Sequence, residues 1–87
     1  MPTISIFFGV VVQMYWSEHP PAHIHAYYGG FEALFEIETG KVIGGRLPPK
    51  VEGMVREWVL KYQGELAHNW ERGRRKLPFE KIPGADV

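Results

Sequence analysis

The sequence lacks cysteine entirely, and its first 40 residues contain no lysine or arginine. Without cysteine, the chain can form neither disulfides nor a thiolate zinc site. Long hydrophobic runs are missing as well, because the most apolar stretch, residues 4–16, is interrupted by Ser5, Gly9 and Gln13. That stretch is too short and too broken for a membrane-spanning helix, and no basic residue precedes it as in a signal peptide. We therefore expect a cytoplasmic protein that does not enter a membrane.

What the chain does contain suits a small globule. It has 87 residues, of which 45% are hydrophobic, and ten Lys and Arg balance ten Asp and Glu. The charges are unevenly placed: residues 1–40 hold four acids (−4), whereas residues 41–87 hold ten bases and six acids (+4). Length and composition predict one domain over residues 1–87. A chain of this size buries only about 60% of its unfolded surface, so a partner subunit or a histidine-bound metal would add stability.

The first half of the chain predicts antiparallel strands. Residues 3–8 and 10–16 are rich in β-branched and aromatic side chains, and Gly9 between them indicates a tight turn or a bulge in one bent strand. Two prolines then place residues 17–22 in a loop. The clearest signal follows, because residues 23–28 and 31–37 are strand formers joined by two glycines, the pattern of a β-hairpin.

The second half predicts helices. A short strand over residues 41–47 ends at Pro48 and Pro49, which suit a helix start. Apolar side chains then recur at a spacing of three and four, at Val51, Met54, Val55, Trp58 and Tyr62. Gly64 is expected to break or bend this helix, residues 65–75 to form a second helical segment, and the tail from Leu77 to be irregular. The fold class is α+β: an antiparallel meander of about four strands, followed by one or two C-terminal helices packed on one sheet face.

Several segments match a known pattern. They are Met-Pro-Thr-Ile-Ser at the start, residues 9–15, Glu-His-Pro-Pro-Ala-His-Ile-His at 18–25, Tyr-Gly-Gly-Phe-Glu-Ala at 28–33, Glu57-Trp58 and Asn69-Trp70. Together they resemble the small bacterial domain-of-unknown-function family numbered 4160, over nearly the whole chain. The resemblance implies a component of a two-gene module of the toxin–antitoxin kind, with a small protein from a neighbouring gene as partner. It implies no established activity.

The histidines are the candidate functional residues of the predicted hairpin. Counting back from the glycine turn pairs Tyr27 with Glu32 and His23 with Glu36, so these side chains and His25 share one polar face. The opposite face is apolar enough to be covered by the helices. His19 lies in the preceding loop, close enough in sequence to fold over the polar face.

Three interpretations of this cluster remain open. His19, His23 and His25, with or without Glu36, could bind zinc or another divalent first-row metal. Alternatively, His23 and His25 could act as acid and base without a metal, with Tyr27 or Glu36 assisting, as cleavage of a phosphodiester beside a ribose hydroxyl would need. The third interpretation is structural: the histidines cap the proline loop and pair with Glu36, which orients a surface for a partner.

A basic run near the C-terminus consists of Arg72, Arg74, Arg75 and Lys76. It could contact nucleic acid, or it could be a solvated helix end whose cations complement the helix dipole. The leading hypothesis is protein association, with the neighbouring gene product or as a homodimer, through the polar sheet face. The alternative is a small endoribonuclease or phosphodiesterase that acts on RNA through the histidines.

Overall fold

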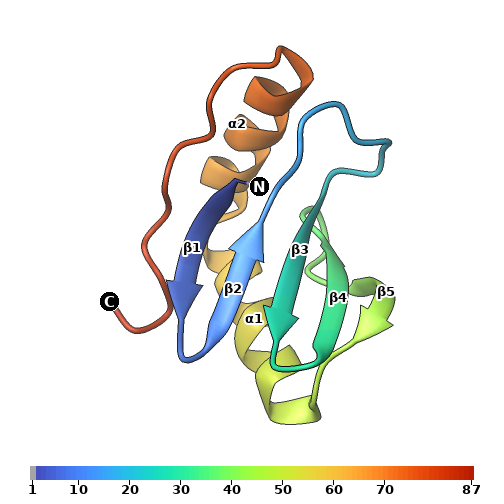
Figure 1. Ribbon diagram of the computed structural model, residues 1–87, viewed down its shortest axis with the longest axis vertical. Helices are drawn as coiled ribbons and strands as arrows, with labels where there is room; N and C mark the ends of the chain where they lie inside the picture. The colour runs from blue at the N-terminus through green and yellow to red at the C-terminus, as the bar shows by residue number, and fades with distance from the viewer. Residues whose placement is uncertain (1) are drawn as a thin grey trace.

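The architecture is a five-stranded antiparallel sheet followed by two helices, as a computed structural model of residues 2–87 shows. The strands follow one another in the sheet in sequence order, and the helices lie behind one face (Figure 1). The elements are β1 (Thr3–Phe7), β2 (Val10–Gln13), β3 (His23–Tyr28), β4 (Phe31–Glu36), β5 (Val42–Arg46), α1 (Pro49–Lys61) and α2 (Gln63–Arg74). The predicted α+β class is confirmed, with five strands instead of about four.

The extra strand comes from a turn at Gly9. Phe8 and Gly9 both have positive φ, at 49° and 79°. Two successive positive φ values are typical of a two-residue hairpin turn, so the chain reverses here instead of continuing as one bent strand. After the turn β2 pairs with β1 and leaves the ladder after Gln13, earlier than the sequence pattern indicates.

The hairpin of β3 and β4 has the predicted register. Tyr28 lies opposite Phe31, Tyr27 opposite Glu32 and His23 opposite Glu36. Because side chains alternate between faces, β3 buries Ile24 and Ala26 on the helix side and turns its histidines to the other side. The glycine turn thus determines which side chains reach the outer face of the sheet.

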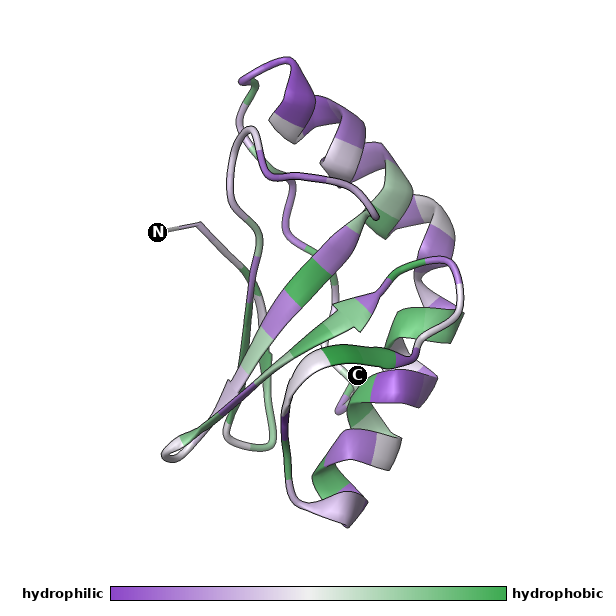
Figure 2. Cartoon of the chain, turned by 90° about the vertical axis from the view of Figure 1, so that its right-hand side faces the viewer, coloured by the Kyte–Doolittle hydropathy of each residue, from purple (hydrophilic) through white to green (hydrophobic). Residues whose placement is uncertain are grey.

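The helices cover the inner face with apolar side chains. Figure 2 views the two layers from the side. Trp58 of α1 is buried, and its ring centroid lies 5.1 Å from that of Phe7 in β1. The bend between the helices falls at Tyr62, two residues before the expected position at Gly64, which lies within α2. Within residues 2–87, no helix combines the length and hydrophobicity that crossing a membrane requires.

The tail after α2 is irregular, as expected, but it is fastened to the domain. The backbone N–H of Ile82 donates to the carbonyl of Ile4 at 2.9 Å, which covers the free edge of β1. The indole N–H of Trp58 donates to the carbonyl of Pro83 at 2.8 Å. These bonds make the tail part of the folded unit and protect an edge strand from unwanted pairing.

Candidate functional site

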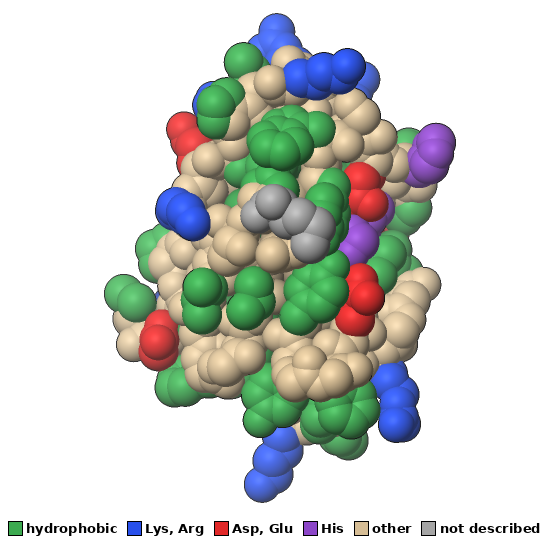
Figure 3. Space-filling view, in the orientation of Figure 1, with side chains coloured by type: hydrophobic (Ala, Val, Ile, Leu, Met, Phe, Trp, Pro, Cys, Tyr) green, Lys and Arg blue, Asp and Glu red, His purple; other side chains and the backbone are tan. Residues whose placement is uncertain are grey.

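Two histidines of β3 and a glutamate of the preceding loop bring their side chains together on the outer side of the sheet. His23 Nε2 lies 3.3 Å from Glu18 Oε1, and His25 Nε2 lies 2.8 Å from the same oxygen. We call Glu18, His23 and His25 the His–Glu cluster. In the view onto the outer face, histidine atoms lie between acidic side chains (Figure 3). The strand alternation and the path of the proline loop together produce this convergence.

The other nitrogen of each imidazole is also engaged. His23 Nδ1 lies 2.7 Å from the carbonyl oxygen of Pro21, and His25 Nδ1 lies 3.3 Å from Glu32 Oε2. A carbonyl only accepts hydrogen bonds, so His23 Nδ1 carries the hydrogen, and in the neutral ring Nε2 presents a lone pair. Metal-binding histidines are held in this way, with the outer N–H donated to a carbonyl or a carboxylate.

The Nε2 atom of His23 has no hydrogen-bond partner among the described residues. It lies 3.3 Å from Glu18 Oε1, but the two atoms are not oriented for a hydrogen bond. Water has little access to it, because the His23 side chain is only 8% exposed. A buried polar atom without a partner is costly, and such atoms are rare in native proteins. A ligand bound within the cluster would satisfy this nitrogen.

The spacing of the three groups suits one ion. One ligand atom from each residue lies within 4.8 Å of the other two. Zinc binds imidazole nitrogen and carboxylate oxygen at roughly 2.0–2.2 Å, which places ligand atoms about 3–3.5 Å apart. The 3.3 Å and 2.8 Å separations of Glu18 Oε1 from the two Nε2 atoms are already close to this spacing. Three protein ligands leave at least one coordination position open.

Aromatic side chains surround the cluster. The ring of Tyr15 meets that of His25 edge-on at 4.6 Å between centroids, and Trp70 of α2 lies 5.3 Å from His23. Tyr15 donates its hydroxyl hydrogen to Gln13 Oε1, so Tyr27 is the donor in the 2.8 Å bond between the two hydroxyls. Burial, together with Tyr15 and Glu32, raises the pKa of Tyr27 well above its ordinary value. Tyr27 is therefore a neutral hydrogen-bond donor at physiological pH.

Not every predicted residue joins the cluster. His19 is exposed and lies outside it, so Glu18 takes the place of His19 in the candidate ligand set. Glu36 lies opposite His23 in the ladder, but its carboxylate accepts a hydrogen bond from Thr39 Oγ1 at 2.6 Å. In residues 2–87 no hydrogen bond or ion pair joins Glu36 to a histidine.

Sequence reasoning missed Glu18 as a ligand and Glu32 as the partner of His25. A signal for Glu18 was present, since a carboxylate is as good a ligand for a divalent metal as an imidazole. The predicted basic residues Arg72, Arg74, Arg75 and Lys76 lie at the C-terminal end of α2 and in the turn after it. Within the described chain they form no hydrogen bond or ion pair with the cluster.

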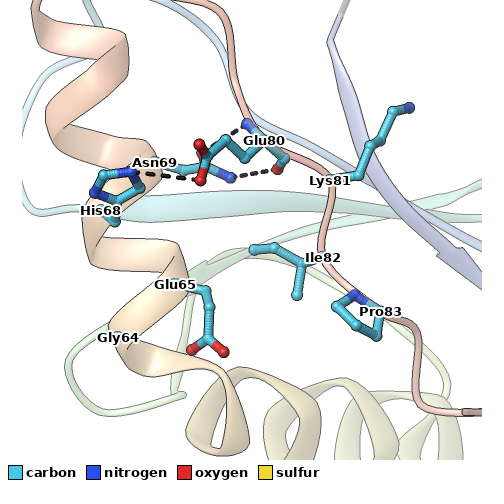
Figure 4. A pocket seen from close by; sticks show the side chains of 8 residues that line it. All are labelled: Gly64, Glu65, His68, Asn69, Glu80, Lys81, Ile82 and Pro83. Carbon is cyan, nitrogen blue, oxygen red and sulfur yellow. Dashed lines mark hydrogen bonds and ion pairs between the residues drawn. The ribbon is translucent and has the colours of Figure 1, made fainter.

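A separate cavity of about 310 Å³ lies between α2 and the tail. Figure 4 shows Asn69 bonded to the backbone of Glu80 on one side of it, and His68 facing the Glu80 carboxylate at 3.4 Å. Both side chains are exposed to solvent. The cavity thus lies where the tail is bonded to α2. It shares no residue with the His–Glu cluster.

The fold and the cluster define a small α+β protein with a candidate metal centre on its sheet. The family described as "Domain of unknown function (DUF4160)" matches residues 9–71, and the chain belongs to this family. The matched region includes all three residues of the His–Glu cluster and Trp70. Comparison with curated proteins and with solved structures gave no match.

Proposed function

We propose that this protein is a divalent-metal-dependent hydrolase whose ion is bound by Glu18, His23 and His25. The observation that carries the proposal is the buried, unpartnered Nε2 of His23, which lies beside His25 Nε2 and Glu18 Oε1. Both imidazoles are fixed from behind by acceptors, Pro21 O and Glu32 Oε2. Such support for the ligands is typical of metal centres.

The same geometry disfavours a metal-free acid–base pair. An acid and a base that cleave a phosphodiester act on different atoms of the substrate, so their nitrogens must face the bond from separate positions. Here both Nε2 atoms lie within 3.3 Å of one carboxylate oxygen. Because the two Nε2 atoms converge on this one point, their arrangement suits a single shared ion better than two separate substrate atoms.

The donor set also limits the metal and its chemistry. Two imidazoles and one carboxylate suit zinc and other divalent first-row metals, and zinc hydrolases use this combination. An ion held by three protein ligands keeps a position for water, whose pKa zinc lowers to about 7. Glu18 is 25% exposed and His25 is 12% exposed, so the open position would face solvent. Hydrolysis of an ester or phosphodiester is the reaction class that such a centre supports.

Calorimetric titration of the metal-free protein with zinc, manganese and cobalt tests the binding step. We expect one ion per chain, with affinity lost in Glu18→Gln and His25→Gln. The matched controls are His19→Gln and Glu36→Gln, which alter the other predicted candidates and should leave binding unchanged. Loss of binding in His19→Gln with retention in Glu18→Gln would refute this ligand set. Hydrolysis of bis(p-nitrophenyl) phosphate, with and without metal, then tests the reaction.

Protein association is a second candidate function. Ile6 of β1 is 63% exposed and Phe8 in the adjoining turn is 60% exposed. Ile43 of β5 and Phe31 of β4 are exposed as well. Apolar groups of this size on a sheet favour contact with another protein. A toxin–antitoxin module, with a neighbouring gene product as partner, stays a prediction. Growth of a bacterial host on induction of the chain, alone and with the neighbouring gene, tests it.

A further inference from the structure

The C-terminal end of α2 carries a basic, aromatic surface that the proposed metal centre does not use. Trp16 is 46% exposed, and one face of its indole stacks on Phe79 at 5.1 Å with an interplanar angle of 25°. The indole N–H donates to the carbonyl of Leu77 at 2.9 Å. The ring is therefore held rigidly at the surface, where a second flat group could stack on it.

Basic residues lie on the chain segment that holds this ring. Gly73 packs so closely against the Phe79 ring that a Cβ there would lie 2.9 Å from it, and 3.6 Å from the carbonyl oxygen of Tyr15. The last turn of α2, which contains Arg72 and Arg74, therefore packs against Phe79, the ring on which Trp16 stacks. Arg72 fastens the tail by donating Nε–H to the carbonyl of Pro78 at 2.6 Å. Figure 3 shows Lys and Arg side chains gathered at the top of the outer face, where Figure 1 places the end of α2.

Two of these cations are free to bind an anion. Arg74 pairs with Glu71 at 2.9 Å. Arg75 and Lys76 are exposed and, within residues 2–87, have no acidic side chain within ion-pair distance. Figure 2 shows the same end of α2, at the top of the view, in the purple of hydrophilic residues. Leu77, whose carbonyl accepts the Trp16 indole N–H, directly follows Arg75 and Lys76, so the two free cations lie on the segment that holds the exposed ring.

This surface and the His–Glu cluster are formed by the same two chain segments. Trp16 precedes Glu18 by two residues in the same loop, and the neighbouring Tyr15 ring contacts His25. From the other side, Trp70 lies one turn before Arg74 on α2 and contacts His23. The same loop and the same helix therefore connect the basic end of α2 to the metal ligands.

We propose that Trp16, Arg75 and Lys76 bind single-stranded nucleic acid and direct one of its phosphodiesters to the metal centre. A base would stack on Trp16 and the adjacent phosphates would contact the two cations, the combination that single-strand binding proteins use. This inference rests on the proposed hydrolase. In the reaction a water oxygen bonds to phosphorus, one phosphorus–oxygen ester bond breaks, and the proton lost from water ends on the departing oxygen.

The acidic groups around the cluster should make strand binding depend on metal. Glu18 and Glu32 repel a phosphate, and a bound divalent cation cancels that repulsion. We therefore expect the strand to bind more tightly to the metal-loaded protein than to the metal-free protein. The cations at the end of α2 should still give measurable binding without metal at low salt.

Fluorescence anisotropy with a labelled 12-nucleotide oligouridylate tests the surface, with oligothymidylate and a 12-base-pair duplex beside it. At 50 mM salt we expect Trp16→Ala to weaken binding roughly tenfold or more, because base stacking is lost. Trp16→Phe keeps an aromatic ring and should retain most of the affinity. Removal of two phosphate contacts in the Arg75→Gln/Lys76→Gln variant should reduce the salt slope by roughly 1.4. Equal binding of both single strands identifies a general strand site, and binding of oligouridylate alone identifies contacts to the 2′-hydroxyl.

The control is the pair Lys41→Gln/Lys50→Gln, which removes two exposed lysines far along the chain from α2. Equal weakening by this control pair, or tighter binding of the duplex than of the single strands, would overturn the inference. So would the absence of single-strand binding at 50 mM salt with and without zinc. Zinc titration of the Trp16→Ala protein separates the two proposals: it should bind zinc normally, whereas His25→Gln should lose zinc and keep the metal-free affinity for the strand. Circular dichroism checks that each variant folds.

Discussion

The side-chain amide of Asn69 bonds to both backbone groups of Glu80. Its Nδ2 donates to the Glu80 carbonyl at 2.8 Å, and its Oδ1 accepts from the Glu80 N–H at 2.9 Å. Asn69 is fully buried, although asparagine is mostly exposed in proteins. One buried polar side chain of α2 thus satisfies both backbone groups of a residue in a tail that has no regular secondary structure.

Asn69→Ala should therefore destabilise the protein by about 2–3 kcal/mol, since two backbone groups of Glu80 lose their partner where the tail meets α2. Urea unfolding followed by circular dichroism measures the change. The matched control is His68→Ala, the neighbouring exposed residue, which should change the free energy of unfolding by about 0.5 kcal/mol or less. If Asn69→Ala lowers the free energy of unfolding by no more than His68→Ala does, and by about 0.5 kcal/mol or less, the attachment of the tail adds little stability.

Metal should stabilise the fold without being required for it. The buried core consists of aliphatic and aromatic side chains of the sheet and helices, and it forms without any group from Glu18 or His25. We expect a chelator to leave the circular dichroism spectrum unchanged. Metal at 100 times its dissociation constant should add about 2.7 kcal/mol, or roughly 10 °C or more in Tm. Glu18→Ala should abolish the metal-induced rise, and complete unfolding in chelator would instead indicate a structural metal.

Much of the fold could be predicted because its signals are local. The two glycines at 29–30 fix the hairpin turn, and the side-chain period of two then fixes the register of β3 against β4. The apolar stripe that contains Val55 and Trp58 predicted the buried side of α1 in the same way. Turn chemistry and periodicity are readable from one sequence without knowledge of the rest of the molecule.

The site could be predicted only in part, because it depends on the path of a loop. His23 and His25 lie on a strand, where alternation places them on one face. Glu18 and His19 lie in the proline loop, where no periodicity decides which of two adjacent side chains turns inward. The structure turns Glu18 toward the histidines and leaves His19 exposed. Likewise, no local signal shows that Asn69 meets Glu80, since that contact depends on where the tail returns.

Tyr27 should make the stability of the protein depend on alkaline pH. Burial, Tyr15 and Glu32 raise its pKa above the ordinary value of about 10, so the folded protein keeps a proton that the unfolded chain loses. This stabilisation is complete below pH 10 and is lost progressively as pH rises above that value. In Tyr27→Phe the loss should be smaller, and Tyr15→Phe, which removes one cause of the shift, should give an intermediate slope. Urea unfolding between pH 8 and pH 11 measures the slopes, and parallel curves would contradict the assignment.

Glu32 should act on the metal through His25. Its carboxylate lies 3.3 Å from His25 Nδ1, behind the ring as seen from Glu18, and it forms no part of the His–Glu cluster. Loss of such a supporting carboxylate lowers metal affinity by roughly 10- to 100-fold, because the ring is no longer fixed in its orientation. We expect Glu32→Ala to weaken zinc binding by this factor in a chelator competition assay, while binding stays at one ion per chain. Glu36→Ala, on the same strand, should leave the affinity unchanged because the Glu36 carboxylate contacts Thr39. If both substitutions weaken zinc binding equally, the effect arises from the general negative charge of the face, and Glu32 does not orient His25.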